Sequence, residues 1–180
     1  MFQLLELIEN EEDREFCRKL YCQYRNALYR EAYQILRNSA DAEDAVQECF
    51  AAVAKNIEKV SRENCHKAWN YIVTILRNKA FNAYNKRNRE YGMEPDMIEK
   101  KMLQAEGDGE IFELSDGGNM SELIGRMKYP YKEVLFLQYY NELTYKEIAD
   151  VFETTPDNVR HISYRAKKKL EGELKKGKLL

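Results

Sequence analysis

Apolar residues recur at three- and four-residue intervals along most of this chain, which is the pattern of amphipathic helices. In the first half, the pattern predicts helices over residues 12–37, 42–53 and 67–89, with Asp41 as the cap of the second helix. Alternation with the period of a β-strand is rare. We therefore expect an all-helical (all-α) protein.

The helical pattern breaks off between Tyr91 and about Met120, where glycine and acidic residues replace the apolar repeat. We expect a division of the chain into residues 1–90, 91–120 and 121–180. The two outer segments predict small helical domains, and the middle segment predicts a flexible acidic linker between them.

The last third of the chain contains two short helices with clear start signals. Thr144 and Glu147 have the spacing of a capping box, in which each side chain satisfies a free backbone N–H. After a short break, Thr155 fits a cap position and Pro156 suits the first helical position, where its missing N–H costs nothing. Two capped helices separated by a tight turn are typical of a helix-turn-helix, so DNA is the leading partner.

The second of these helices has an apolar face and a basic face. The apolar stripe predicts packing and consists of Val159, Ile162, Ala166 and Leu170. An ordinary helical hairpin with a solvated basic face would have the same caps. Crowded cations repel one another unless phosphates neutralise them, so the basic face favours DNA binding over a simple hairpin. The candidate DNA contacts lie away from the stripe and are Arg160, His161, Tyr164, Arg165 and Lys168, followed by Lys169.

Charge is segregated along the chain, although the net charge is only −2. Residues 61–90 hold seven Lys or Arg against two Asp or Glu, and residues 155–180 hold eight against three. Between them, residues 91–122 hold nine acidic and two basic residues. Two basic patches joined by an acidic connector suit a protein that contacts DNA at two places.

The composition argues against several other classes of protein. No apolar run is long enough to span a bilayer and the N-terminus lacks the signal-peptide pattern, so we expect a cytoplasmic protein. There is no glycine-rich phosphate loop and the two histidines lie far apart, so we expect no catalysis and no cofactor. Reduced, mostly buried thiols are expected instead of a zinc site or disulfides, because no Cys-x-x-Cys pair occurs among Cys17, Cys22, Cys49 and Cys65.

Three motifs along the chain occur in a recognisable order. They are the acidic stretch at residues 41–50, the segment 71–78 with its polar and basic tail, and residues 143–149 followed by 159–170. Together they resemble the extracytoplasmic-function (ECF) sigma factors of the sigma-70 family, which are promoter-recognition subunits of bacterial RNA polymerase. The resemblance spans nearly the whole chain.

The resemblance implies a role for each motif. The acidic helix would bind a coiled coil of the polymerase clamp through Asp44, Gln47 and Glu48, although a merely solvated acidic face has the same pattern. The helix-turn-helix would read the minus-thirty-five promoter element. The linker would thread the polymerase, and an inhibitory anti-sigma factor would be a further partner.

By the same resemblance, the helix over 67–89 would recognise and open the minus-ten promoter element. Opening needs cations for phosphates, and aromatic or amide groups for unstacked bases. The aromatic candidates are Trp69, Tyr71, Phe81 and Tyr84, of which Trp69 and Tyr71 could equally be core residues. The polar and basic candidates are Arg77, Asn78, Lys79, Asn82, Asn85, Lys86 and Arg87.

Two other classes of protein remain open at this point. A free-standing helix-turn-helix regulator would bind duplex DNA tightly alone, as a dimer on a palindrome, whereas a sigma factor would gain promoter specificity with core polymerase. A purely protein-binding adaptor would be unaffected by neutralising Arg160 and Arg165.

The chain also departs from the family pattern, with Tyr71 at the usual tryptophan position and an inverted polar and apolar order at Ile162 and Ser163. These departures leave the promoter sequence open.

Overall fold

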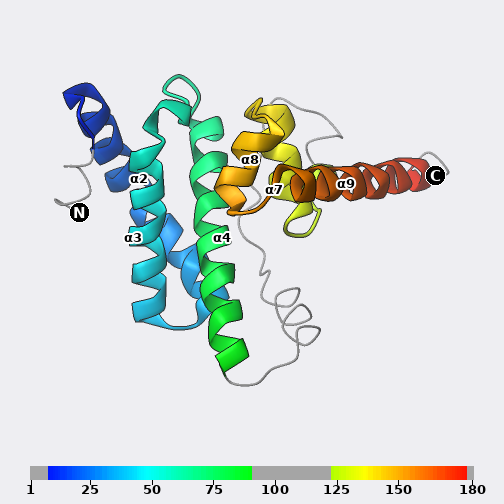
Figure 1. Cartoon of the computed structure of the whole chain (residues 1–180), viewed down its shortest axis with the longest axis horizontal. Helices are drawn as coiled ribbons and strands as arrows, with labels where there is room; N and C mark the ends of the chain where they lie inside the picture. Colours follow the sequence, from blue (N-terminus) through cyan, green and yellow to red (C-terminus); the bar gives the residue numbers. More distant parts are fainter. Residues whose placement is uncertain (1–7, 91–122, 178–180) are drawn as a thin grey trace. The chain divides into compact units, whose positions relative to one another are not determined.

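The computed structural model describes residues 8–90 and 123–177, which form two compact units (Figure 1). Every regular element in these two ranges is helical and neither range contains a strand, which confirms the all-helical class with two helical domains. The predicted acidic linker, residues 91–120, lies outside the described residues, and the proposed domain boundaries stay a prediction. No helix in the described part of the chain is long and apolar enough to cross a membrane.

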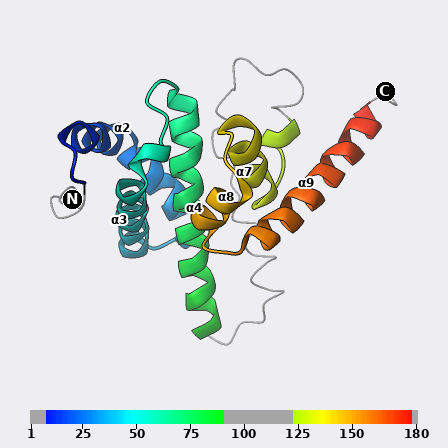
Figure 2. The same ribbon diagram turned by 45° about the horizontal axis from the view of Figure 1, so that its top comes forward.

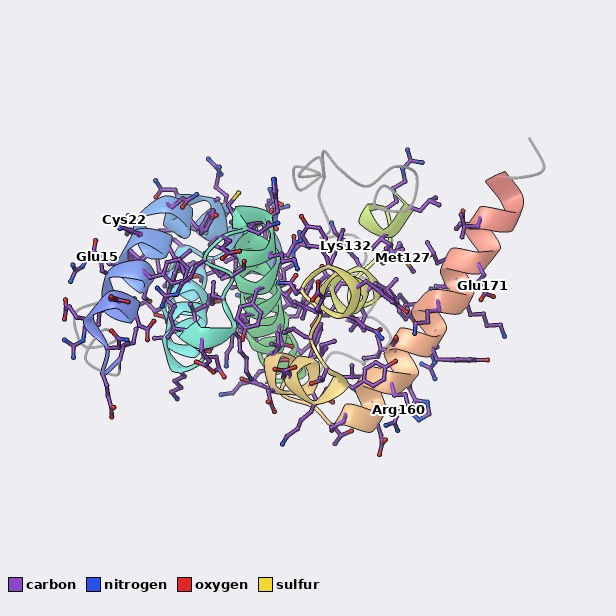
Figure 3. All side chains as sticks on the ribbon, turned by 90° about the horizontal axis from the view of Figure 1, so that it is seen from above. Glu15, Cys22, Met127, Lys132, Arg160 and Glu171 are labelled. Carbon is purple, nitrogen blue, oxygen red and sulfur yellow. The ribbon has the colours of Figure 1, made fainter. Side chains whose placement is uncertain are left out.

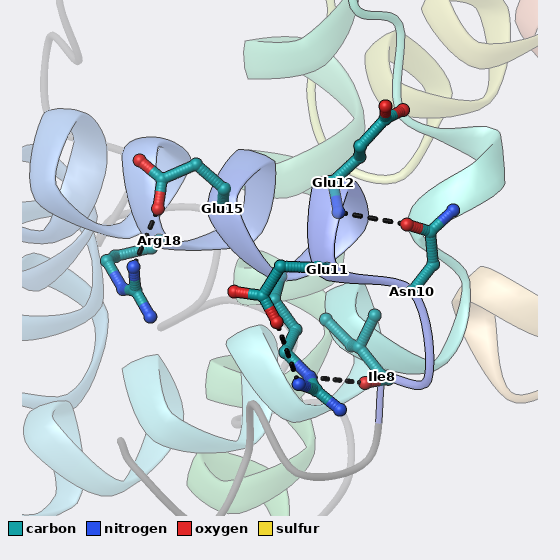
Figure 4. Close-up of polar contacts among 7 residues, drawn as sticks. Ile8, Asn10, Glu11, Glu12, Glu15 and Arg18 are labelled. Carbon is teal, nitrogen blue, oxygen red and sulfur yellow. Dashed lines mark hydrogen bonds and ion pairs between the residues drawn. The ribbon is translucent and has the colours of Figure 1, made fainter.

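The N-terminal unit, residues 8–90, is a bundle of three long helices (Figures 1 and 2). The first, α2 (Glu11–Leu36), begins after Asn10, whose side-chain oxygen accepts a hydrogen bond from the Glu12 N–H at 2.9 Å (Figure 4). It ends where Arg37 adopts a left-handed backbone conformation with φ 52°. The predicted helix over 12–37 is therefore confirmed to within one residue at each end.

The second helix of the bundle, α3 (Ser39–Lys55), begins earlier than the sequence predicts. Asn38 is its cap, because the Asn38 backbone is extended and its side-chain oxygen accepts from the Asp41 N–H at 3.1 Å. The prediction of Asp41 as the cap is wrong. Asp41 already lies in the first turn, where its N–H is one of the free donors that a cap must satisfy.

A short 3₁₀ turn, η1 (Ile57–Lys59), leads to the third helix, α4 (Cys65–Glu90). The Asn64 side-chain oxygen accepts from the backbone N–H groups of His66 and Lys67, both at 3.0 Å. The helix therefore begins two residues before the predicted start at Lys67. An asparagine that accepts from two backbone N–H groups is a strong helix start.

Apolar side chains from all three helices form the core of this unit. The Cys49 thiol is also buried there and donates to the Ile72 carbonyl at 3.4 Å. Tyr71 is only 1% exposed, so this tyrosine is a core residue. The largest fully buried side chains of the unit are Tyr71, Leu28, Leu36, Ile72, Leu76, Val53 and Thr74.

The C-terminal unit, residues 123–177, contains α7 (Tyr131–Leu135), the π-helical turn η2 (Phe136–Tyr140), α8 (Tyr145–Phe152) and α9 (Pro156–Gly177). The π turn is wider than an α-helical turn, and Asn141 N–H donates to the carbonyl five residues back at 3.0 Å. Sequence patterns did not predict this turn. A cluster of buried residues in the core of the C-terminal unit contains Ile124, Leu135 and Ala166. The partly buried residues packed against this cluster are Met127, Tyr131, Phe136 and Leu170.

The predicted helix-turn-helix is confirmed in α8 and α9. Glu147 N–H donates to the Thr144 hydroxyl at 3.3 Å, and Thr144 N–H donates to the Glu147 carboxylate at 2.9 Å, which completes the capping box. Asn158 N–H donates to the Thr155 hydroxyl at 3.2 Å, so Thr155 caps α9 as expected. The turn between the helices includes Glu153 in a left-handed conformation with φ 52°.

Candidate nucleic-acid interface

The two sides of α9 differ in burial and charge. Val159 and Ala166 are fully buried, while Ile162 and Leu170 are half-buried, so the predicted stripe does pack against the unit. The opposite side, here named the outer face of α9, carries the six candidate DNA contacts, and all six are exposed. They are Arg160, His161, Tyr164, Arg165, Lys168 and Lys169.

Arg160 is positioned by two neighbours near the start of α9, where Figure 3 labels it. Its guanidinium donates to the Asp157 carboxylate at 2.5 Å and lies 5.9 Å from the centre of the Tyr145 ring. The Arg160 side chain is still 64% exposed. This arginine is therefore restrained on one side and open to a ligand on the other.

A polar network links α9 to the rest of the C-terminal unit. Ser163 is fully buried and its hydroxyl donates to the Gln138 side-chain oxygen at 2.8 Å. The Gln138 amide donates to the Tyr145 hydroxyl at 3.3 Å. The Ser163 hydroxyl, the Gln138 amide and the Lys167 ammonium hold the pKa of Tyr145 below its ordinary value, with Ser163 as the main cause. Sequence analysis missed this network, because no pattern links Gln138 to residues so far along the chain.

Two lysines of α9 lie against tyrosine rings of the same unit. Lys169 Nζ is 4.5 Å from the centre of the Tyr131 ring, and Lys167 Nζ is 5.3 Å from the centre of the Tyr139 ring. A hydrogen bond with the Tyr139 hydroxyl raises the pKa of Lys167 above its ordinary value. The ammonium groups of both lysines therefore lie against aromatic rings within the unit.

In the N-terminal unit, two arginines of α4 bind acidic residues of the same unit. Arg77 pairs with Glu31 of α2 at 3.0 Å, and only about a fifth of each side chain is exposed. Arg87 pairs with Asp41 of α3 at 2.7 Å and also lies over the Tyr84 ring. Both arginines therefore hold the bundle together as well as carrying positive charge.

The other candidates on α4 differ widely in exposure. Asn82 and Lys86 are exposed, Lys79 and Asn85 are half-buried, and Asn78 is only 3% exposed. Asn78 therefore lies in the interior and not on the face that α4 offers to a ligand. Asn78 was predicted as a DNA contact from its place in the motif. On the helix, however, its position faces the interior of the bundle.

The aromatic candidates on α4 also divide between interior and surface. Tyr71 and Phe81 are buried, at 1% and 4% exposure. Trp69 is half-buried, with its ring centre 5.2 Å from that of Tyr24, and Tyr84 is half-buried as well. In this conformation, only Trp69 and Tyr84 present ring surface that a base could reach.

The acidic side chains of α3 form an exposed surface, as predicted. This acidic face consists of Glu43, Asp44, Gln47 and Glu48, and all four residues are exposed. A groove of about 210 Å³ lies beside it between α2 and α3. The residues that line this groove are Tyr21, Arg25, Asn26, Tyr29, Glu43, Val46 and Gln47. A partner could thus insert side chains into the groove while it contacts the carboxylates.

The cysteines lie in the N-terminal unit and all four are free thiols. Cys17 and Cys49 are buried, whereas Cys22 and Cys65 are exposed, so the expectation of mostly buried thiols holds for half of them. Burial raises the pKa of both Cys17 and Cys49. Within residues 8–90 and 123–177, no three His, Cys, Asp or Glu side chains are grouped so that they could hold a metal ion.

Two helical units, one of them a helix-turn-helix with a basic outer face, define a DNA-binding transcription protein. The family model of sigma-70 region 2 matches residues 20–90, and that of sigma-70 region 4 matches residues 117–170. The RNA polymerase sigma factor SigV of Bacillus subtilis (strain 168) is 26% identical over 153 residues, which are 85% of this chain and 87% of SigV. The ECF RNA polymerase sigma factor SigM of the same organism is 26% identical over 162 residues, which are 88% of this chain and 95% of SigM.

These matches extend over both units and agree with their order along the chain. The chain belongs to the ECF sigma factors of the sigma-70 family, and it is a transcription initiation factor that directs transcription to promoters.

Proposed function

We propose that the outer face of α9 reads the minus-thirty-five promoter element in the major groove. The observation that carries this proposal is the division of α9 into a buried apolar side and an exposed basic side. Val159 and Ala166 keep the helix docked, while Arg160 and Arg165 are exposed toward base edges or phosphates. Such a helix enters a groove without losing its own packing.

The exposed polar side of α4 binds the minus-ten element in this proposal. Asn82 and Lys86 are exposed, and Tyr84 and Trp69 offer ring surface elsewhere on the same helix. Stacking one base on an aromatic ring is worth about 1–3 kcal/mol, which is comparable to the few kcal/mol that separate a base from its stack. A small number of such contacts is therefore sufficient to hold an opened base.

The acidic face of α3 binds core RNA polymerase. Asp44 and Glu48 would pair with basic side chains of the partner, and Gln47 supplies an amide at the rim of the groove between α2 and α3. Charge complementarity of this kind speeds association and selects the partner.

The same family membership supports the remaining partners and properties. The protein acts in the cytoplasm without catalytic activity or a cofactor of its own. An inhibitory anti-sigma factor binds it until a signal releases it.

Run-off transcription tests this function directly. Purified core RNA polymerase is incubated with a pool of genomic promoter fragments, with and without the full chain. New, specific transcripts that require the chain are expected, and their upstream sequences give the promoter motif. The absence of such transcripts, together with tight dimeric binding to duplex DNA without polymerase, would establish the free-standing regulator instead.

A further inference from the structure

We propose that Tyr145 is a positioning residue for Arg160, and that Gln138 and Ser163 hold Tyr145 in place. Base discrimination at the minus-thirty-five element would then depend on side chains that do not touch DNA. This inference rests on the proposed role of α9. It adds residues of η2 and α8 to the determinants of promoter choice.

The first step is the restraint on Arg160. An exposed arginine has many rotamers, and this freedom is lost when the side chain binds a base in one geometry. Here the guanidinium already donates to Asp157 at 2.5 Å and lies 5.9 Å from the Tyr145 ring centre, within the range of a cation–π contact. Arg160 is the fifth residue of α9, and the first residues of a recognition helix are those that contact base edges.

The second step is what fixes the Tyr145 ring. Tyr145 is the first residue of α8, so its backbone position is set by the Thr144 capping box. Its hydroxyl accepts from the Gln138 amide at 3.3 Å, and the Gln138 side-chain oxygen accepts from Ser163 at 2.8 Å. Because the hydroxyl is anchored, the ring stays in its place beside the Arg160 guanidinium.

The third step is the burial of Ser163, at the other end of this series of contacts. Ser163 is fully buried on α9, and a buried hydroxyl without a partner would be costly. Its hydrogen bond to Gln138 therefore fixes the amide, whose backbone lies in the π turn η2. The contacts run from the interior of the unit to an arginine at its surface, through the hydrogen bonds of Ser163 and Gln138, the Tyr145 ring and the Arg160 guanidinium. π turns are often found at functional sites, which agrees with this assignment.

The test compares variants in the reconstituted holoenzyme on a promoter and on derivatives with single base-pair changes in the minus-thirty-five element. Arg160→Ala identifies the base pair that Arg160 reads, since discrimination is lost there alone. Tyr145→Leu is expected to reduce discrimination at that same base pair by about two- to fivefold. Tyr145→Phe keeps the ring but loses the hydroxyl, and we expect an intermediate loss that Ser163→Ala reproduces.

Tyr139→Leu is the control, because Tyr139 is a tyrosine of the same unit that also makes a cation–π contact, but to Lys167. It should leave discrimination at the Arg160 base pair unchanged. The double variant with Tyr145→Leu and Arg160→Ala should discriminate no worse than Arg160→Ala alone, because both changes act through one contact.

The outcomes separate the inference from the function on which it rests. If Arg160→Ala discriminates less at one base pair while Tyr145→Leu discriminates as the unmodified protein does, the positioning role is wrong. An equal loss of activity by Tyr145→Leu on every derivative, with lower thermal stability, would also overturn it and leave a purely structural role. If Arg160→Ala changes discrimination nowhere, the proposed function of the outer face fails, and the inference fails with it.

Discussion

Arg87 binds Asp41 at 2.7 Å and also donates to the backbone carbonyl of Leu36 at 3.0 Å. One guanidinium thus connects the last turns of α4 to the end of α2 and the first turn of α3. The region of α4 that is proposed to face DNA is therefore held in place by an acidic residue. Asp41 also lowers the positive charge that this region offers to phosphates.

Removal of the Asp41 charge should strengthen non-specific DNA binding by the N-terminal unit. Asp41→Asn keeps the size of the side chain and the backbone N–H that Asn38 caps, but it leaves the Arg87 charge unbalanced. Each additional phosphate contact changes the slope of log K against log salt by about 0.7 for single-stranded DNA. Anisotropy titrations of the full chain with a labelled single strand over a range of salt concentrations measure this slope.

The matched control for this change is Asp44→Asn, on the acidic face of the same helix. It removes the same charge without freeing Arg87. Because the Asp41 pair is partly exposed, its loss should cost only about 0.5 kcal/mol of stability. Equal slopes for Asp41→Asn and Asp44→Asn would show that Arg87 makes no additional phosphate contact.

Charge reversal on the acidic face of α3 should weaken binding to core polymerase. Asp44→Lys with Glu48→Lys places two cations where the partner is proposed to be basic, and we expect the affinity to fall by about tenfold or more. Glu58→Lys, at an exposed position of the turn η1, is the control for charge change outside this face. Co-purification and fluorescence titration with core polymerase measure the effect. Unchanged affinity of the double variant would remove α3 from the proposed interface.

Neutralising Arg165 should reduce promoter-specific transcription without affecting assembly with core polymerase. A lost base contact costs about 1–3 kcal/mol at one position, whereas a lost phosphate contact weakens all sequences and lowers the salt slope by about 1. Arg165→Ala is compared with Lys146→Ala, which removes an exposed charge from α8. Loss of core binding by Arg165→Ala would contradict the division of roles between the two units.

The buried thiols make the stability of the N-terminal unit depend on pH. Burial raises the pKa of Cys17 and Cys49, so the folded state keeps protons that unfolded thiols release above about pH 8.5. The contribution is fully present below that pH and is lost as the pH rises. The expected slope is at most about 1.4 kcal/mol per pH unit for each thiol.

Denaturant unfolding between pH 7 and 10 tests this dependence. Trp69 is the single tryptophan of the chain and lies in the N-terminal unit, so its fluorescence follows that unit alone. Cys49→Ala should unfold with a shallower pH dependence, whereas Cys22→Ala, at an exposed thiol, should not differ from the unmodified protein in slope. Parallel pH profiles for all three proteins would refute the role of the buried thiols.

The sequence predicts best those parts of the fold that neighbouring residues along the chain determine. Thr144 and Glu147 satisfy each other within one turn, and Thr155 caps the next helix, so a few neighbouring residues decide both helix starts. The error at Asp41 has a local cause too. Asn38 and Asp41 are both good caps and lie three residues apart, and the end of α2 decides between them.

The parts that were missed depend on contacts between distant residues. Arg77 and Glu31 lie 46 residues apart, and Ser163 and Gln138 lie 25 apart, so no periodic pattern links them. Asn78 is polar and lies in a basic motif, but the geometry of the bundle buries it. Sequence identified the two faces of α9, whereas the packing of whole units decided which polar residues of α4 reach the surface.

The separation of α9 into a docking side and an outer face has an evolutionary consequence. Substitutions at exposed helix positions usually change stability by less than about 0.5 kcal/mol, whereas a buried position such as Val159 or Ser163 tolerates little. New side chains at Tyr164 or Arg165 can therefore be tried by mutation without unfolding the protein. A gene duplicate of this factor could acquire a different set of target genes through a few changes on one side of one helix, while its scaffold stays the same.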